Sequence, residues 1–309
     1  KMMAATSNVI IIKGQEIIQA WKWFLQNLSY RPSKNAPHDF IFDNKLWKNT
    51  NYSYLSSKDP ISIENIHKLY ITSQFSGDPN DLVEISMGVL RDTTIRTPKV
   101  EDGVIKLLSD KDSFRYSLSE NLACWLQLAT LVQMDSASKY VVSLPNASPR
   151  DPGPDGLSVF VDENSLDVVE IRSVKSAKDR NPKSMIASTQ FSKGGAADPT
   201  KQLDELYLIC VGEHGFIKFD RLLTDTFYRL GRKAQDEYRA ALIQKQSRLN
   251  AVVIADYQHA KPEIFSSYSR IPRLPVERIA TFVGIDDWDT FSNNIQDRVL
   301  KTLESFGVI

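Results

Sequence analysis

The feature that most constrains the fold is a pair of short apolar runs that enclose a polar turn near the middle of the chain. The runs cover residues 157–161 and 166–172, and Asp162-Glu163-Asn164-Ser165 lies between them. Strands rich in Val, Ile and Leu that flank turn-forming residues are typical of a β-hairpin. We therefore expect an antiparallel hairpin whose cross-strand pairs bring charged residues together.

Counting outward from the turn predicts which residues of the hairpin lie opposite one another. An even-length loop pairs Val161 with Leu166 and, further from the turn, Asp155 with Arg172. Asp155 then lies diagonal to Glu170 at roughly 7–8 Å along the backbone, close enough for two carboxylates to share one divalent cation. Charged groups that end an apolar stripe are expected to be paired or to bind a metal, because burying them alone is costly. The apolar residues on that face are Leu157, Val159, Val161, Leu166 and Val168.

At these residues the chain resembles the PD-(D/E)xK nuclease superfamily. Its core hairpin carries Pro-Asp on one strand and an acidic-x-Lys triplet on the next. Pro154-Asp155 matches the first part, and Glu170-Ile171-Arg172 matches the second except that arginine replaces the final lysine. Arginine keeps a positive charge and can bind phosphate oxygens through two N–H groups, but it does not act as a general base because it stays protonated in proteins. The resemblance covers residues 117–210, about a third of the chain.

A helix is expected before the hairpin, where Ser117-Leu118-Ser119-Glu120 opens a run with apolar residues at helical spacing. Many superfamily members carry a glutamate near the metal on this helix, and the resemblance gives that role to Glu120. The alternative is a capping box, in which Glu120 accepts a hydrogen bond from the backbone N–H of Ser117 and has no part in the chemistry.

A second helix is expected after the hairpin, where Asp198 caps a helix and Pro199 lies in its first turn. Relatives place a lysine or glutamine of this helix near the site, which corresponds to Lys201 or Gln202. The alternative is an ordinary surface helix with an ion pair between Lys201 and Glu205. Residues 172–201 contain seven basic residues and two acidic ones, which favours a segment that contacts phosphates, although solvated lysines would give the same pattern.

The resemblance implies a metal-dependent nuclease acting on DNA in preference to RNA. Asp155, Glu170 and the carbonyl of Ile171 would hold Mg²⁺ or Mn²⁺, with Glu120 as an outer or second-site ligand. Arg172, helped by Lys175 or Gln202, would stabilise the negative charge that develops on the phosphate.

Two alternative interpretations fit the same residues. The chain could keep the nuclease fold without cleaving, as a nucleic-acid-binding or assembly subunit in which Arg172 forms a salt bridge with Asp155 or Glu170. Otherwise the hairpin match is accidental and the protein is an α/β interaction subunit.

The predicted fold class is α/β (α+β), with a restriction-endonuclease-like core in which helices flank a mixed central sheet. Residues 140–144 would form its first strand, the hairpin the next two, and residues 251–256 a later strand. We expect an N-terminal mixed α/β or helical extension over residues 1–115 and the nuclease-like domain over residues 116–309. Restriction and anti-phage systems use such cores with a helicase or ATPase, and by analogy we expect such a partner.

Composition narrows these expectations only slightly. Lys plus Arg and Asp plus Glu both number 38, so a nucleic-acid surface must come from local clustering. The sequence contains no apolar run of the roughly 18–20 residues that a membrane span needs, and no Walker or dinucleotide-binding loop. The two cysteines, Cys124 and Cys210, lie in apolar surroundings, which predicts buried thiols in a reducing cytoplasm.

Overall fold

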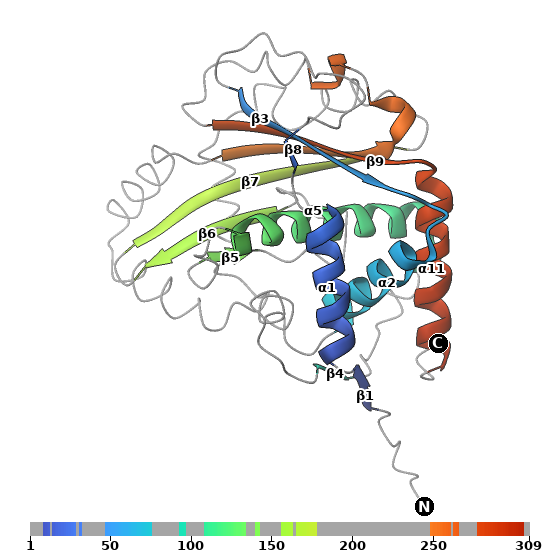
Figure 1. The fold of residues 1–309 in the computed structure, drawn as a ribbon. Coiled ribbons are helices and arrows are strands. Elements are labelled where there is room, and N and C mark those ends of the chain that lie inside the picture. Colours follow the sequence, from blue (N-terminus) through green and yellow to red (C-terminus); the bar gives the residue numbers. More distant parts are fainter. Residues whose placement is uncertain are drawn as a thin grey trace, which may run out of the picture.

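The computed structural model describes residues 9–12, 14–28, 31–32, 47–75, 93–96, 108–133, 140–142, 156–162, 165–177, 248–260, 262–265 and 277–305. These residues form a mixed α/β structure, in which helices lie against one large sheet (Figure 1). The predicted α/β class is therefore confirmed. The elements are β1 (Val9–Ile12), α1 (Gly14–Leu28), β2 (Arg31–Pro32), β3 (Trp47–Leu55), α2 (Pro60–Phe75), β4 (Thr93–Arg96), α5 (Lys111–Gln133), β5 (Tyr140–Val142), β6 (Gly156–Asp162), β7 (Ser165–Ala177), β8 (Arg248–Asp256), the 3₁₀ turns η3 (Tyr257–His259) and η4 (Pro262–Phe265), β9 (Glu277–Ile285) and α11 (Trp288–Ser305).

The sheet has seven strands in the order β2-β3-β9-β8-β7-β6-β5. Its centre is parallel, because β3, β9, β8 and β7 run in the same direction, and β6, β5 and β2 are antiparallel to their neighbours. Strands that are covered on both faces read as continuous apolar runs, and residues 251–255 of β8 are all buried. The predicted strands at 140–144 and 251–256 and the hairpin correspond to β5, β8 and the β6–β7 pair.

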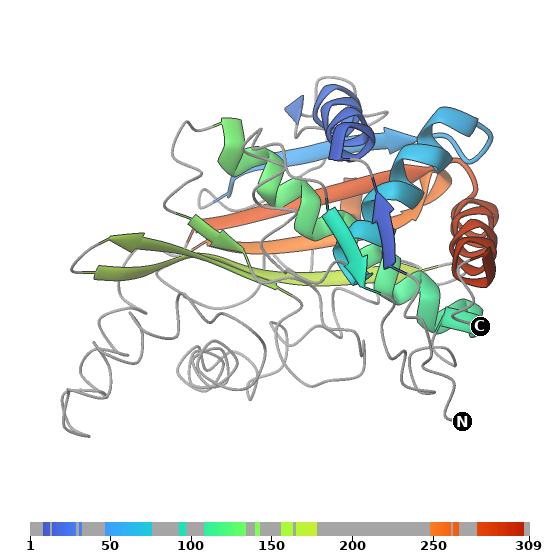
Figure 2. The same ribbon diagram turned by 90° about the horizontal axis from the view of Figure 1, so that it is seen from below.

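One apolar core joins the helices to the sheet. Helices α1, α2 and α5 lie on the same face of the sheet, and α11 lies at its end (Figure 2). Three tryptophans, Trp21, Trp125 and Trp288, are among the largest fully buried side chains, and Phe24 stacks on Trp21 and meets Trp125 edge-on. Burying such side chains contributes roughly 1.5–3 kcal/mol each. The core includes residues from both sides of the predicted domain boundary at residue 115. Strand β3, before this boundary, also pairs with β9, after it. The division into two domains stays a prediction.

An aspartate marks the beginning of α5, a helix of 23 residues. Asp110 caps α5, because its carboxylate accepts hydrogen bonds from the backbone N–H and the hydroxyl of Ser113 at 2.9 and 2.5 Å. The helix predicted to open at Ser117 therefore exists but begins earlier, at Lys111. Ser117 lies in its interior and shares a 2.9 Å hydrogen bond with the Tyr70 hydroxyl. The capping-box alternative for Glu120 is wrong, because Ser117 is not at a helix terminus.

Candidate active site

The turn of the predicted hairpin is confirmed. Asp162 pairs with Ser165 and Val161 with Leu166, so the loop between the strands has even length. Beyond the turn the register shifts, because Val159 pairs with Val168 but Ser158 pairs with Glu170. Val169 is thus an extra residue in β7, which is the geometry of a β-bulge.

The bulge changes which residues lie opposite one another at the predicted site. Gly156 pairs with Arg172 and Ser158 with Glu170, so the predicted pairing of Asp155 with Arg172 is wrong, and so is the predicted diagonal position of Asp155 beside Glu170. Because cross-strand partners share a face, Arg172 belongs with Gly156 and Ser158, whereas Leu166 pairs with Val161 on the opposite face. Glu170 and Arg172 therefore lie on the face of the hairpin opposite to Val161 and Leu166. They do not extend the apolar stripe that was predicted to end at them.

Arg172 is directed into the interior, towards α5. Its side chain is 0% exposed, and Nη1 donates hydrogen bonds to the carbonyl oxygen of Ala123 at 3.0 Å and to Oε1 of Gln127 at 2.5 Å. Its Nε and Nη2 have no oxygen or nitrogen partner among the residues that the structure describes. A buried guanidinium that lacks such partners carries a large desolvation cost, which its remaining contacts with α5 must offset.

Other polar groups lie beside Arg172 in the same layer. Asn250 of β8 is its register neighbour and is buried, and its Oδ1 accepts a hydrogen bond from Thr281 Oγ1 of β9 at 3.0 Å. Cys124 of α5 is buried as predicted, and burial raises the pKa of its thiol, while the charge of Arg172 and a hydrogen bond with its side chain act in the opposite direction. Sequence reasoning missed Gln127 and Asn250, although one polar residue inside the apolar run 249–255 was a usable signal for Asn250.

The other predicted site residues are described to different extents. Glu120 is half-buried in α5, and its charge adds to burial in raising the pKa of Tyr70, which places it near the Tyr70–Ser117 hydrogen bond. For Glu170, Ile171 and Lys175 only the backbone is described, within β7. Asp155, Lys201, Gln202, Cys210 and the basic segment after residue 177 lie outside the described residues.

Whether a metal fits depends on donors that are not among the described side chains. Those side chains contain no group of three His, Cys, Asp or Glu residues that could hold a metal ion. The predicted donors are carboxylates and a backbone carbonyl, which are the oxygen ligands that Mg²⁺ and Mn²⁺ prefer. Glu170 lies on β7, and Gly156, the residue that follows Asp155, lies on the neighbouring strand β6. The pairing of these two strands brings the two segments together.

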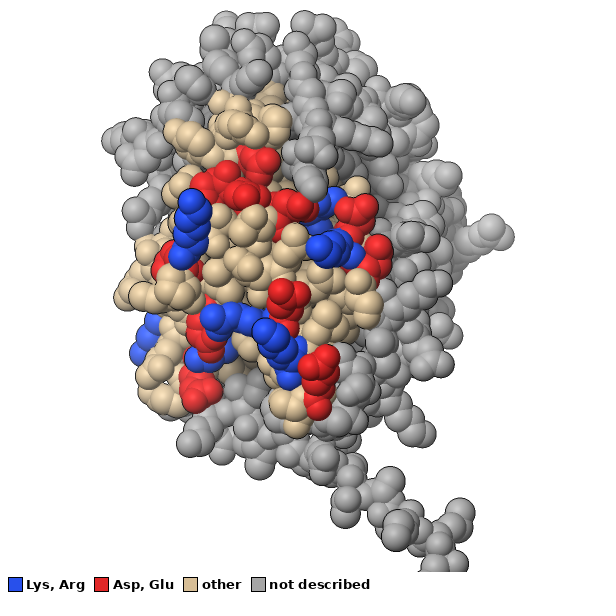
Figure 3. Space-filling model, turned by 90° about the vertical axis from the view of Figure 1, so that its right-hand side faces the viewer, with Lys and Arg blue, Asp and Glu red and all other residues tan. Residues whose placement is uncertain are grey.

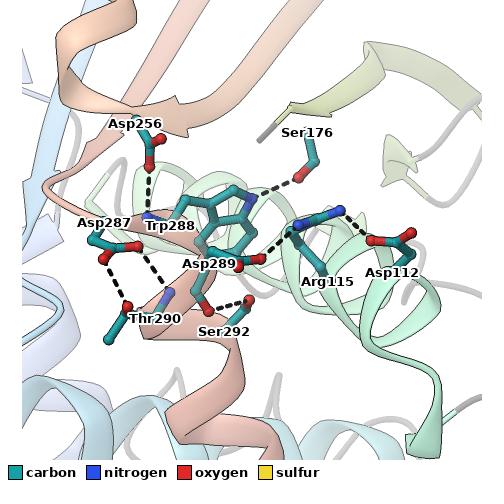
Figure 4. Close-up of polar contacts among 9 residues, drawn as sticks. All are labelled: Asp112, Arg115, Ser176, Asp256, Asp287, Trp288, Asp289, Thr290 and Ser292. Atoms are coloured by element: carbon teal, nitrogen blue, oxygen red, sulfur yellow. Dashed lines mark hydrogen bonds and ion pairs between the residues drawn. The ribbon is translucent and has the colours of Figure 1, made fainter. Parts of the chain in front are cut away.

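A second polar cluster lies at the carboxyl ends of the parallel strands (Figure 4). The backbone N–H of Trp288 donates to Asp256 Oδ1 at 2.6 Å, and its indole N–H donates to Ser176 Oγ at 2.8 Å. Arg115 forms ion pairs with Asp112 and with Asp289, the latter at 2.9 Å. These bonds connect β7, β8 and α5 to the start of α11, so we interpret the cluster as structural.

The side of the molecule where α11 lies carries both signs of charge. Figure 3 shows acidic and basic side chains alternating around a mostly uncharged centre on this side. Ion pairs account for part of this pattern, because Glu64 pairs with both Lys68 and Arg298. This side therefore presents no continuous basic surface among the residues described.

Comparison with known proteins adds no relative. No family model matches the chain, and neither the curated proteins nor the solved structures contain a match. Within the described part of the chain, none of the helices combines the length and the apolar character that crossing a membrane requires.

Proposed function

We propose that the protein is a metal-dependent nuclease that hydrolyses phosphodiester bonds of DNA, with a restriction-endonuclease-like core. The observation that carries the proposal is the order of the elements around β7. Helix α5 precedes three antiparallel strands, β5, β6 and β7, and β8 then pairs parallel to β7. The strand with Glu170-Ile171-Arg172 lies inside the sheet, beside the strand that begins after Asp155, and under α5. This order puts Gly156, the first residue of β6, on the strand next to Glu170, as a site shared with Asp155 would require.

The chemistry expected of this site follows from its donors. Asp155, Glu170 and the Ile171 carbonyl would hold Mg²⁺ or Mn²⁺, with Glu120 as an outer ligand. When bound, the metal supplies a water molecule of lowered pKa and neutralises charge on the phosphate. Lys175 and Gln202 would hold the phosphate in line with that water through their N–H groups. Asp155 precedes the first residue of β6, so the alternation of side chains along β6 does not determine on which face of the sheet its carboxylate lies.

The proposed setting is restriction or anti-phage defence in the cytoplasm, with a helicase or ATPase as partner. This setting rests on analogy with nucleases of this type. A separate helicase or ATPase is part of it because the chain contains no nucleotide-binding loop of its own.

A second candidate function is supported by the burial of Arg172. Its guanidinium is held by α5 and is fully buried, so the residue in the place of the family lysine does not reach solvent. A nuclease fold that binds nucleic acid or assembles with a partner without cutting would tolerate this arrangement.

Cleavage assays separate the two functions. Supercoiled, linear and single-stranded DNA would be incubated with Mg²⁺ or Mn²⁺ and with the wild type, Asp155→Asn or Glu170→Gln, each with and without a co-encoded partner. Asp297→Asn is the matched control, because Asp297 is an exposed carboxylate on α11. We expect cutting by the wild type and the control that is lost in both site variants. Retained DNA binding without cutting under every condition would favour the second function.

A further inference from the structure

Two exposed tyrosines meet where the parallel strands end. Tyr54 lies one residue before the end of β3 and is 47% exposed, and Tyr257 directly follows β8 and is 41% exposed. Their ring centroids are 5.5 Å apart and their planes are nearly perpendicular, at 82°. Ligands of open α/β sheets commonly bind outside the carboxyl ends of the parallel strands. The two rings are therefore placed where the fold favours a binding site.

Gly284 of β9 leaves room for the two rings to meet. Tyr54 pairs with Gly284, and Gly284 pairs with Ala255, so β9 lies between the strands that position the tyrosines. These two strands are thus separated by two strand spacings, roughly 10 Å. A glycine in the row between them has no side chain to separate the rings. Tyr54 and Tyr257 consequently form one aromatic surface across β9.

A carboxylate lies beside this aromatic surface. Burial raises the pKa of the Tyr54 hydroxyl, and the negative charges of Asp286 and of ionised Tyr257 add to this effect. Burial alone would raise the pKa of Asp286, but hydrogen bonds from Ser57 and from Ser56 Oγ, the latter at 3.0 Å, outweigh it and lower that pKa. At neutral pH the surface therefore combines a neutral phenol ring with a charged carboxylate.

The charges around the rings favour a cation over a phosphate. Residues 54–59 and 284–288 contain three aspartates, Asp59, Asp286 and Asp287, and one basic residue, Lys58. The excess of negative charge repels a phosphate backbone and attracts a cation. Among cations, a guanidinium fits best, because it is planar, stacks on aromatic faces and is more weakly hydrated than an ammonium.

We propose that Tyr54, Tyr257 and Asp286 form a docking surface for an arginine side chain of a partner protein. The guanidinium lies against the tyrosine rings, and Asp286 supplies the opposite charge. This inference goes beyond the proposed nuclease function, because it concerns a contact with a partner and uses none of the proposed metal ligands.

The test measures binding of a fluorescein-labelled hexa-arginine peptide to the full chain, by fluorescence anisotropy at about 150 mM NaCl. Tyr116→Leu is the matched control, because Tyr116 of α5 is 46% exposed. We expect Tyr54→Leu and Tyr257→Leu each to weaken binding about fivefold or more, and Tyr116→Leu to stay within about twofold of the wild type. Tyr54→Phe keeps the ring and should also stay within about twofold.

A second comparison leaves the protein unchanged. Hexacitrulline has the shape of hexa-arginine without its charge, so the wild type should bind it at least about tenfold more weakly. Circular dichroism confirms that each variant is folded. Should Tyr54→Leu not fold, Tyr257→Leu still tests the surface, since Tyr257 lies in a 3₁₀ turn outside the sheet. Absence of hexa-arginine binding by the wild type, or equal binding of both peptides, would overturn the proposal.

Stacking of nucleobases is the alternative use of two exposed tyrosines. A labelled oligothymidine strand would therefore be measured with the same variants. We expect Tyr54→Leu and Tyr257→Leu to bind it as the wild type does. If these variants lose the strand but keep hexa-arginine, the surface belongs to nucleic acid and the proposal is wrong.

Discussion

At the scale of single residues, Arg172 is the most unusual group of the described structure. Its Nε and Nη2 are buried without an oxygen or nitrogen partner among the described residues, yet its Nη1 connects β7 to α5. Buried charges are often replaceable by apolar residues at little cost, whereas removing the whole side chain leaves a cavity.

These two effects predict a difference between two substitutions of Arg172. We expect Arg172→Ala to lower the free energy of unfolding by about 3 kcal/mol and Arg172→Met to lower it by clearly less, because methionine fills the space and has no unpaired donor. Urea unfolding followed by tryptophan fluorescence measures both values. Equal losses would mean that the hydrogen bonds to α5 outweigh the packing.

His67 predicts how stability depends on pH. Burial lowers the pKa of His67 to about 4, with Glu64 opposing this shift and Arg298 adding to it, and its Nε2 lies 3.0 Å from Thr302 Oγ1. The unfolded chain takes up a proton near pH 6.5 and the folded chain only near pH 4, so stability should fall as the pH drops through this window, by up to about 3 kcal/mol. Urea unfolding at pH 4.5, 5.5 and 7.5 measures this fall. In His67→Gln the fall should be smaller, and an unchanged pH dependence would contradict the assignment.

At the scale of elements, α11 depends on a cap at its start. Asp287 accepts hydrogen bonds from the backbone N–H of Thr290 at 2.9 Å and from its hydroxyl at 2.6 Å. We expect Asp287→Ala to lower the free energy of unfolding by about 1 kcal/mol, since the cap satisfies N–H groups that have no partner within the helix. Asp297→Ala, an exposed change further along α11, should alter stability by less than about 0.5 kcal/mol. Thermal unfolding of both variants tests this, and equal effects would mean that charge and not capping is responsible.

At the scale of the whole molecule, the chain before residue 115 is built into the same core as the rest. Leu69 and Tyr70 of α2 and Phe24 of α1 are buried in the cluster that contains Trp125 and Val299. Removing them would expose this cluster, and it would also leave β9 without its neighbour β3.

We therefore expect a fragment of residues 108–309, which keeps Asp110 as the cap of α5, to lack a cooperative thermal transition. Circular dichroism and binding of a hydrophobic dye would compare it with the full chain, which should unfold in one transition. A fragment that unfolds cooperatively without binding the dye would instead support two independent domains.

Local patterns in the sequence were enough for the parts of the fold that depend on local chemistry. The turn between β6 and β7, the helical segment that forms most of α5 and the apolar strand β8 were all predicted, because each follows from turn residues or from a short repeat of apolar positions. The start of α5 was misplaced although Asp110 and Ser113 carry the local signal, since Ser117 and Glu120 form an equally good capping pattern.

The sequence by itself determined the hairpin strands, the helix before them and strand β8, because periodicity and turn chemistry act over a few residues. Only the tertiary structure decided the register beyond Val169, the burial of Arg172 against Ala123 and Gln127, and the pairing of β3 with β9. These features depend on how α5 fits the sheet and on contacts between residues more than two hundred positions apart. A bulge of one residue exchanges the two faces of a strand, and its position is set by packing, which no local pattern records.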